Sequence, residues 1–269
     1  MNLYNVLKFW LFSSTIASIH GAHEGKNHTL SHMEDLERLA YKYGTDKSKD
    51  DHKYVDIYAS LFNPRRHSTE SLLEIGIAAG QSLQMWNEYF PRAMIYGVDI
   101  NRPAANVAEN LAKLPRVRLL FGDSTKEGEV NNFHLPAEGF DIIIDDGNHK
   151  SWFQESTLRN FWKFVKPGGH YIMEDVDAQL GGFDFSETPH FLANSTRDIF
   201  EANHVSFVDA HVGHRAWKDW LRTATSVSAK DHRIHNSYLV ILRKRIGLVP
   251  PIRINSGIVA MNPGKVVSP

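Results

Sequence analysis

The stretch SLLEIGIAAGQS (residues 71–82) decides the fold of this chain. It is an apolar run that passes into a turn of small residues, in which Gly76, Ala78 and Gly80 permit a tight bend and close approach of a ligand to the backbone. Four further apolar runs follow, separated by amphipathic stretches: AMIYGVDI, VRLLFGD, FDIIIDD and HYIMED. Apolar strands that alternate with helices predict a parallel sheet covered on both faces, which is a doubly wound α/β domain.

The segments before and after these alternating strands and helices also predict secondary structure. Residues 33–43 and 54–62 have helical spacing and predict two short helices before the sheet, and residues 189–203 predict another after it. Two closing runs, HVSFVDAHV and SYLVILRK, lack a full crossover helix between them and suit an antiparallel edge. The fold class is therefore α/β, with a Rossmann-like, mostly parallel, seven-stranded sheet and a helical N-terminal lead-in.

The chain divides into four expected parts. Residues 1–22 predict a signal peptide, and residues 23–68 a polar lead-in followed by a helical segment. Residues 69–245 form the α/β domain, and residues 246–269 an irregular C-terminal tail rich in Pro and Gly.

The first 22 residues bear on where the protein works. One lysine, an apolar run over residues 9–19 and small residues at 21 and 22 are typical of a secretory signal, although an ordinary apolar helix is the alternative. Sequons at 27–29 and 194–196 fit a glycoprotein of the secretory pathway. Cysteine is absent, which excludes disulfides and thiol catalysis. We expect a secreted or secretory-pathway protein, or a cytoplasmic one if the segment is not a signal.

Composition limits the partners. The 30 basic and 31 acidic residues leave a net charge of −1, so nothing in the overall charge favours nucleic acid or an anionic membrane surface. We expect a small molecule or a peptide as the partner, and the sequence leaves a homo-oligomer open.

Acidic residues stand at the carboxyl ends of the predicted strands, where open α/β sheets bind ligands. Asp99 is placed to accept hydrogen bonds from both ribose hydroxyls, and Asp123, after Gly122, to frame an adenine edge. Glu74 lies within the turn, where a carboxylate receives an ammonium but repels a pyrophosphate. This favours S-adenosylmethionine over a nicotinamide dinucleotide.

A second group of polar residues follows strands four and five of the predicted sheet. Asp146, Glu174 and Asp175 can converge there, because neighbouring strands lie about 4.8 Å apart, and three carboxylates suit Mg²⁺. His149 lies three residues beyond Asp146 and could accept the proton of a substrate hydroxyl. The alternatives are a helix-capping role for His149 and a solvated turn at residues 174–175.

These motifs carry a resemblance to a known family. The series Glu74-x-Gly76-x-x-x-Gly80, Asp99, Gly122-Asp123 and the turn Lys166-Pro167-Gly168-Gly169 resembles the class I S-adenosylmethionine-dependent methyltransferases over residues 70–245. Ala78 departs from the family, which commonly has a middle glycine there. The resemblance implies an enzyme whose cofactor-binding residues are Glu74, Gly76, Gly80, Ser82, Asp99, Asp123 and Asp145.

A narrower likeness concerns the catalytic loop. Asp146-Gly147-x-His149, followed by Glu174-Asp175, resembles the metal-dependent sugar O-methyltransferases of macrolide pathways. The lead-in Lys42-Tyr43-Gly44-Thr45-Asp46-Lys47, with Tyr54 and Tyr58, is similar to theirs. The resemblance implies S-adenosyl-L-methionine and Mg²⁺ as cofactors, His149 as base, and a lead-in that closes over the cofactor. The expected reaction is methyl transfer to a hydroxyl of a sugar or secondary metabolite.

Other functions stay open at this point. The chain could methylate nitrogen on a peptide natural product, which needs a base but no metal. It could be a non-enzymatic secreted derivative of the fold, although retention of Glu74, Asp99, Asp146 and His149 argues against decay of the site. A hydroxylase relative would need a two-histidine, one-carboxylate set, which the sequence does not display. Residues 176–190 and 211–235, which would decide the acceptor, contain no readable motif.

Overall fold

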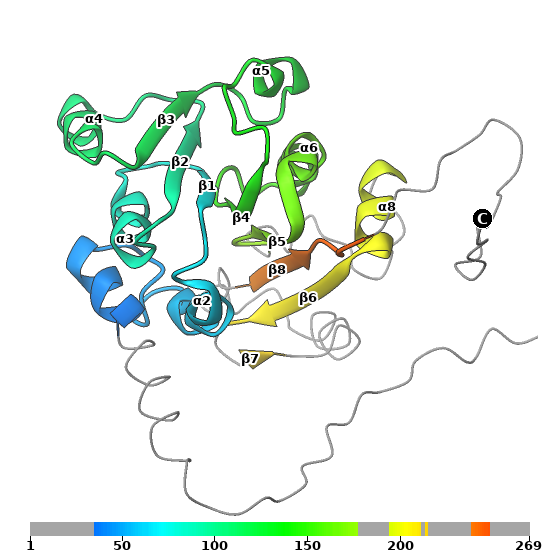
Figure 1. Ribbon diagram of the computed structural model, residues 1–269, viewed down its shortest axis with the longest axis horizontal. Coiled ribbons are helices and arrows are strands. Elements are labelled where there is room, and N and C mark those ends of the chain that lie inside the picture. Colours follow the sequence, from blue (N-terminus) through cyan, green and yellow to red (C-terminus); the bar gives the residue numbers. More distant parts are fainter. Residues whose placement is uncertain (1–34, 177–193, 211–212, 215–237, 248–269) are drawn as a thin grey trace, which may run out of the picture.

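The computed structural model describes residues 35–176, 194–210, 213–214 and 238–247. Residues 35–43 are helical and precede the other elements. These follow in chain order (Figure 1): α2 (Tyr54–Phe62), η1 (Asn63–Arg65), β1 (Ser71–Ile75), α3 (Gln81–Tyr89), β2 (Met94–Asp99), α4 (Ala105–Ala112), β3 (Val117–Phe121), α5 (Glu127–Asn131), β4 (Phe140–Asp145), α6 (Ser151–Phe161), η2 (Trp162–Phe164), β5 (Val165–Met173), α8 (Asn194–Ala202), β6 (His204–Asp209), β7 (Gly213–His214) and β8 (Tyr238–Arg243).

One sheet organises the described residues. Its strand order is β3-β2-β1-β4-β5-β8-β6-β7, and the first five of these strands are parallel. β8 pairs antiparallel with both β5 and β6, and β7 adds two residues at the edge beyond the seven longer strands. The prediction of a mostly parallel, seven-stranded, Rossmann-like sheet with an antiparallel edge is confirmed.

The register of the central strands brings three strand ends together. Ile75, the last residue of β1, pairs with Val98 of β2 and with Asp145 of β4. Asp145 in turn pairs with Met173 of β5. The turn after β1 therefore lies directly beside the loops that begin at residues 146 and 174.

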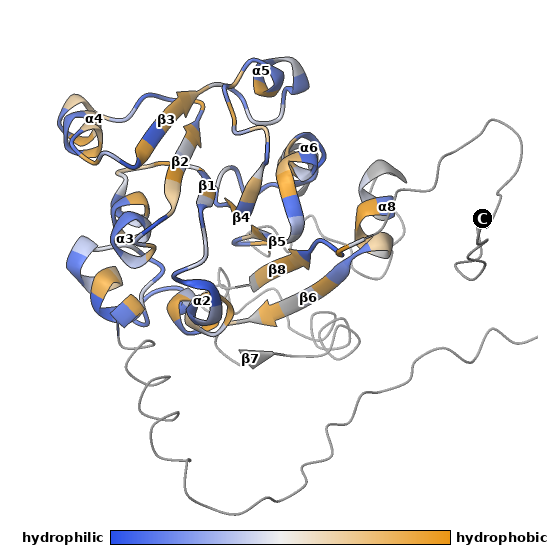
Figure 2. Cartoon of the chain, in the orientation of Figure 1, coloured by the Kyte–Doolittle hydropathy of each residue, from blue (hydrophilic) through white to orange (hydrophobic). Residues whose placement is uncertain are grey.

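Both faces of the sheet are buried. Leu72 of β1 packs in a cluster with residues of α2, α3 and α4, whereas Leu73, its neighbour, packs in a second cluster with residues of α5 and α6. Successive strand residues point to opposite faces, so a strand that is apolar throughout needs helices on both sides. Figure 2 shows the largely apolar strands between helices with mixed surfaces.

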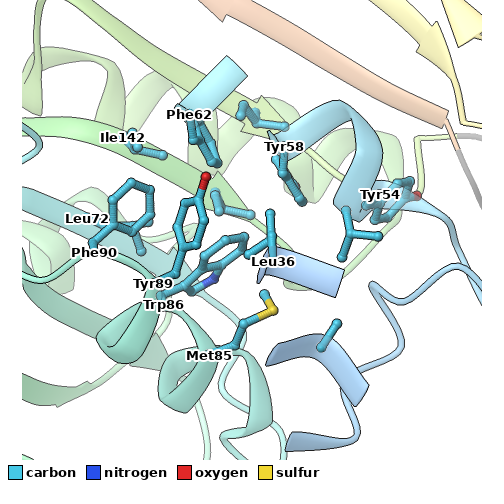
Figure 3. Close-up of a cluster of buried hydrophobic side chains, with 14 of the residues drawn as sticks. Leu36, Tyr54, Tyr58, Phe62, Leu72, Met85, Trp86, Tyr89, Phe90 and Ile142 are labelled. Carbon is cyan, nitrogen blue, oxygen red and sulfur yellow. The ribbon is translucent and has the colours of Figure 1, made fainter. Parts of the chain in front are cut away.

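Aromatic side chains join the lead-in helices to the α/β domain (Figure 3). Phe62 of α2 stacks on Tyr58 with 5.3 Å between ring centroids. It also lies 6.1 Å from the Trp86 ring and 5.6 Å from the Phe90 ring. All four side chains are fully buried. The lead-in is thus part of the hydrophobic core that covers one face of the sheet.

The turn predicted at residues 166–169 lies inside a strand and does not precede it. It falls within the bounds of β5, after Val165 has paired with Phe140, and regular pairing resumes at His170 opposite Ile142. The positive φ of Gly168, 80°, allows this bulge. The prediction that the turn precedes the strand is therefore wrong.

Some predictions lie outside the described residues. These are the signal peptide, the sequon at 27–29, nearly all of residues 176–190 and 211–235, and the tail after residue 247. The second sequon begins helix α8, where Thr196 is fully buried; glycosylation stays a prediction, as do the four-part division and the secretory location. Among the helices of the described residues, none is long and apolar enough to span a membrane.

Candidate functional site

The turn after β1 has the strained backbone that its small residues allow. The φ angles of Gly76, Ala78 and Gly80 are 96°, 44° and 73°. A Cβ atom on Gly76 would lie 2.1 Å from the carbonyl oxygen of Asp146, so a side chain there would push the two loops apart. Gly80 is the N-cap of α3. Gly76 therefore couples the predicted cofactor turn to the loop that carries the predicted metal ligand.

Asp99 and Asp123 stand at the ends of β2 and β3, as predicted, and both are partly exposed. The Asp99 carboxylate accepts backbone hydrogen bonds from Ile77, at 2.8 Å on Oδ2, and from Asn101, at 2.8 Å on Oδ1. Asp123 accepts from the backbone and the hydroxyl of Thr125. Each carboxylate oxygen can accept more than one hydrogen bond, so Asp99 retains capacity for a ligand hydroxyl.

Glu74 and Asp145 are brought to the site but are not open to a ligand, being 0% and 2% exposed. Glu74 accepts from the Ser82 hydroxyl at 2.7 Å, and Asp145 from the Tyr171 hydroxyl at 3.0 Å. Burial raises the pKa of each carboxyl to about 7. The assignment of Glu74, Asp145 and Ser82 as cofactor contacts stays a prediction. In the structure, the two carboxylates form hydrogen bonds with other side chains of the protein.

The acidic loops after β4 and β5 both contact a buried lysine. Lys47, from the lead-in, places Nζ 2.6 Å from Asp146 Oδ2 and 2.7 Å from Glu174 Oε2. It also lies 3.6 Å from Glu74 Oε1. Burial opposes the charge of Lys47, but these carboxylates raise its pKa well above the ordinary value. The other oxygen of Glu174 accepts a hydrogen bond from the Tyr58 hydroxyl.

Asp175 has a different set of neighbours. Its Oδ1 accepts from the Tyr54 hydroxyl at 2.6 Å and lies 3.5 Å from His52 Nδ1. Its Oδ2 lies 3.6 Å from His149 Nε2. Asp175 has a φ of 52°, which is uncommon for a residue with a side chain. Strained residues of this kind gather at functional sites.

The donor set fits a divalent cation at one point of the site. Asp146, His149 and Asp175 each offer one ligand atom, and these atoms all lie within 4.8 Å of one another. Two carboxylates and an imidazole are suitable donors for a hard or borderline ion. Glu174 is not brought into this group, since Lys47 and Tyr58 take its two oxygens. Its assignment as a ligand stays a prediction.

Two side chains at this site were not predicted from the sequence. Lys47 and His52 were placed only in a lead-in expected to close over the cofactor, whereas both reach the carboxylates after β4 and β5. His52 lies near one carboxylate oxygen of Asp175 and His149 near the other, a juxtaposition that no spacing in the chain reveals. The signal available was local. Lys47 ends the stretch 42–47 that resembles the sugar methyltransferases, whereas His52 lies between that stretch and Tyr54 and was not part of the resemblance.

The fold and its strand-end site together define the class: a Rossmann-like α/β domain with the layout of the class I methyltransferases. Residues 73–176 match the protein family described as a methyltransferase domain. The matched residues run from β1 to just beyond β5 and contain every residue predicted to bind cofactor or metal. The predicted resemblance is confirmed.

Two curated relatives of the chain are named as O-methyltransferases. The chain is 34% identical to the 8-demethyl-8-(2-methoxy-alpha-L-rhamnosyl)-tetracenomycin-C 3'-O-methyltransferase of Streptomyces olivaceus, over 53% of this chain and 37% of the relative. It is 32% identical to the mycinamicin VI 2''-O-methyltransferase of Micromonospora griseorubida, over 67% of this chain and 45% of the relative. The chain spans less than half the length of these relatives.

A solved structure shares the fold. MycE methyltransferase from the mycinamycin biosynthetic pathway, in complex with Mg, SAH and mycinamycin VI, is similar with a TM-score of 0.56 and 25% identity. The similarity covers 80% of this chain and 57% of MycE.

Proposed function

We propose that this protein is an S-adenosylmethionine-dependent O-methyltransferase that acts on a sugar hydroxyl of a glycosylated natural product, with assistance from a divalent metal and His149. The observation that carries the proposal is the convergence of the glycine turn after β1 with the group Asp146, His149 and Asp175. The named activities of the curated relatives support the sugar acceptor.

The cofactor would lie over the carboxyl ends of β1 and β2. There the turn at residues 76–80 allows close backbone approach, and Asp99 is held by two backbone donors in a position to bind ribose hydroxyls. Ile100, next to it, is 64% exposed and offers an apolar surface. These features suit a nucleoside that carries no phosphate at the turn.

Asp146 and Asp175, with His149 beside them, would hold the metal. When bound, S-adenosylmethionine supplies a methyl group on a positively charged sulfonium, and a divalent ion stabilises the alkoxide of an acceptor hydroxyl. His149 accepts the hydroxyl proton, and the Asp175 carboxylate 3.6 Å from its Nε2 stabilises the imidazolium that forms. The protein otherwise orients the two reactants and excludes water.

The test is a methyl-transfer assay with the full chain, S-adenosylmethionine, and a glycosylated acceptor such as mycinamicin VI. We expect a monomethylated product by mass spectrometry, with turnover lost on chelation of divalent ions. His149→Gln should lower turnover by about 10²- to 10⁴-fold because proton removal loses its base. The affinity for S-adenosylhomocysteine should stay unchanged.

His134→Gln is the matched control, since His134 is an exposed histidine outside the site. Equal turnover by His149→Gln and wild type would remove the base assignment. Turnover that continues after chelation would contradict the proposed role of the metal. Transfer to amines in place of hydroxyls would contradict the proposed reaction class.

A further inference from the structure

Lys47 is a buried cation with no access to solvent, its side chain being 1% exposed. Its ammonium group bonds Asp146 and Glu174 at 2.6 and 2.7 Å and faces Glu74 at 3.6 Å. Burial of an ammonium is unfavourable unless hydrogen-bonded anions compensate for the lost water. Two hydrogen-bonded carboxylates, with that of Glu74 3.6 Å away, provide this compensation here.

The same contacts matter to the carboxylates. Asp146 follows β4 and Glu174 follows β5, so Lys47 connects the two acid-bearing loops to each other and both to the lead-in. Carboxylates this close repel one another unless a cation lies between them. A divalent ion held by Asp146 and Asp175, beside His149, would also place positive charge next to Asp146.

We propose that Lys47 is a positioning residue, an internal counter-ion that holds Asp146 and Glu174 together in the metal-free protein and competes with a divalent cation for the oxygens of Asp146. The inference rests on the metal-assisted part of the proposed function. It predicts that a divalent ion can replace the lost charge when Lys47 is neutralised, which a lysine with a packing role alone would not show.

The experiment measures thermal unfolding of the full chain after chelation, with and without added Mg²⁺, for wild type and three variants. Lys47→Met keeps the length of the side chain and removes its charge, and Lys47→Arg keeps the charge. Lys49→Met is the matched control, because Lys49 belongs to the same segment but is 43% exposed and pairs with Glu37 and Asp56.

Without metal, Lys47→Met should unfold roughly 10 °C below wild type, as expected when a buried ionic partner is lost from a domain of this size. Added Mg²⁺ should raise its midpoint by roughly 5 °C or more beyond the rise in wild type. Lys47→Arg and Lys49→Met should follow wild type in both conditions.

Two results would overturn the proposal: a Lys47→Met midpoint equal to that of wild type without metal, or a Mg²⁺ response no larger than that of wild type. If Lys47→Met fails to fold without metal, refolding with Mg²⁺ decides, since recovery supports the proposal and failure to recover overturns it. Binding of S-adenosylhomocysteine to the wild type is measured separately. Absence of this binding would contradict the proposed function, and the thermal unfolding of the Lys47 variants could still be interpreted.

Discussion

Gly76 shows how a single residue couples two parts of the site. Gly76→Ala would place a methyl group against the Asp146 carbonyl, at a backbone φ of 96° that favours glycine. We expect a loss of more than about 2 kcal/mol in the free energy of unfolding, because strain and steric overlap add. Denaturant unfolding checks this.

Gly128→Ala is its control, since Gly128 lies in helix α5 with open space around its Cα. There alanine should stabilise by about 0.5–1 kcal/mol, because the helix gains a better former. Similar effects of the two substitutions would contradict the close approach at Gly76.

His170 gives a pH dependence to stability. Burial, with Arg65 Nη1 2.9 Å from its Nδ1, lowers the pKa of His170 to about 4. Between the ordinary histidine pKa near 6.5 and about 4, the unfolded chain binds a proton that the folded protein does not, so this histidine removes stability as the pH falls. His170→Gln should therefore gain up to about 3 kcal/mol relative to wild type between pH 7 and pH 4.

Urea unfolding at several pH values measures this difference, and His67→Gln, at an exposed histidine, serves as the control. A difference between His170→Gln and wild type that stays constant across the range would show that His170 is protonated equally in both states.

The sequence predicted which acidic residues lie at strand ends, but it did not predict how exposed their side chains are. Asp99 and Asp123 lie where their positions after apolar runs predicted, because the carboxyl ends of parallel strands share one edge. Glu74 is enclosed by Lys47 and Ser82, residues from elements that fold over it. Whether a strand-end carboxylate is open depends on such long-range partners, which spacing along the chain does not reveal.

At the scale of elements, the lead-in helix α2 is held to α3 by aromatic packing. Phe62→Ala should lower the free energy of unfolding by about 3–5 kcal/mol, because it leaves a cavity among Tyr58, Trp86 and Phe90. Leu61→Ala, on the same helix but only partly buried, should have a smaller effect. Calorimetric melting measures the stability of both variants. An equal loss of stability in the two would contradict the greater contribution of Phe62 to the packing.

Elements with strong periodicity were predicted well. Helix α2 has the predicted bounds, 54–62, and β6 and β8 form the expected antiparallel edge. Lys166–Gly169 were misplaced because a Pro-Gly-Gly run is typical of a turn, while its neighbours on both sides pair with β4. The turn residues therefore form a bulge inside β5 and do not precede it.

At the scale of the whole molecule, the sheet order explains why distant residues meet. β1 lies between β2 and β4, so the glycine turn has Asp99 on one side and the loop with Asp146 and His149 on the other. The alternation of strands and helices predicted this arrangement. The closure of the lead-in on residues 146, 174 and 175 was not predictable, because it depends on contacts more than 90 residues apart in the chain.

The carboxyl-end edge of the sheet should bind S-adenosylmethionine, and calorimetric titration of the full chain with S-adenosylhomocysteine measures this binding. We expect saturable binding that weakens at least about tenfold in Asp99→Ala, since the ribose loses a charged hydrogen-bond acceptor. Glu109→Ala, at an exposed acid on α4, should bind like wild type. Absence of binding by the wild type, or equal binding by Asp99→Ala, would contradict the account.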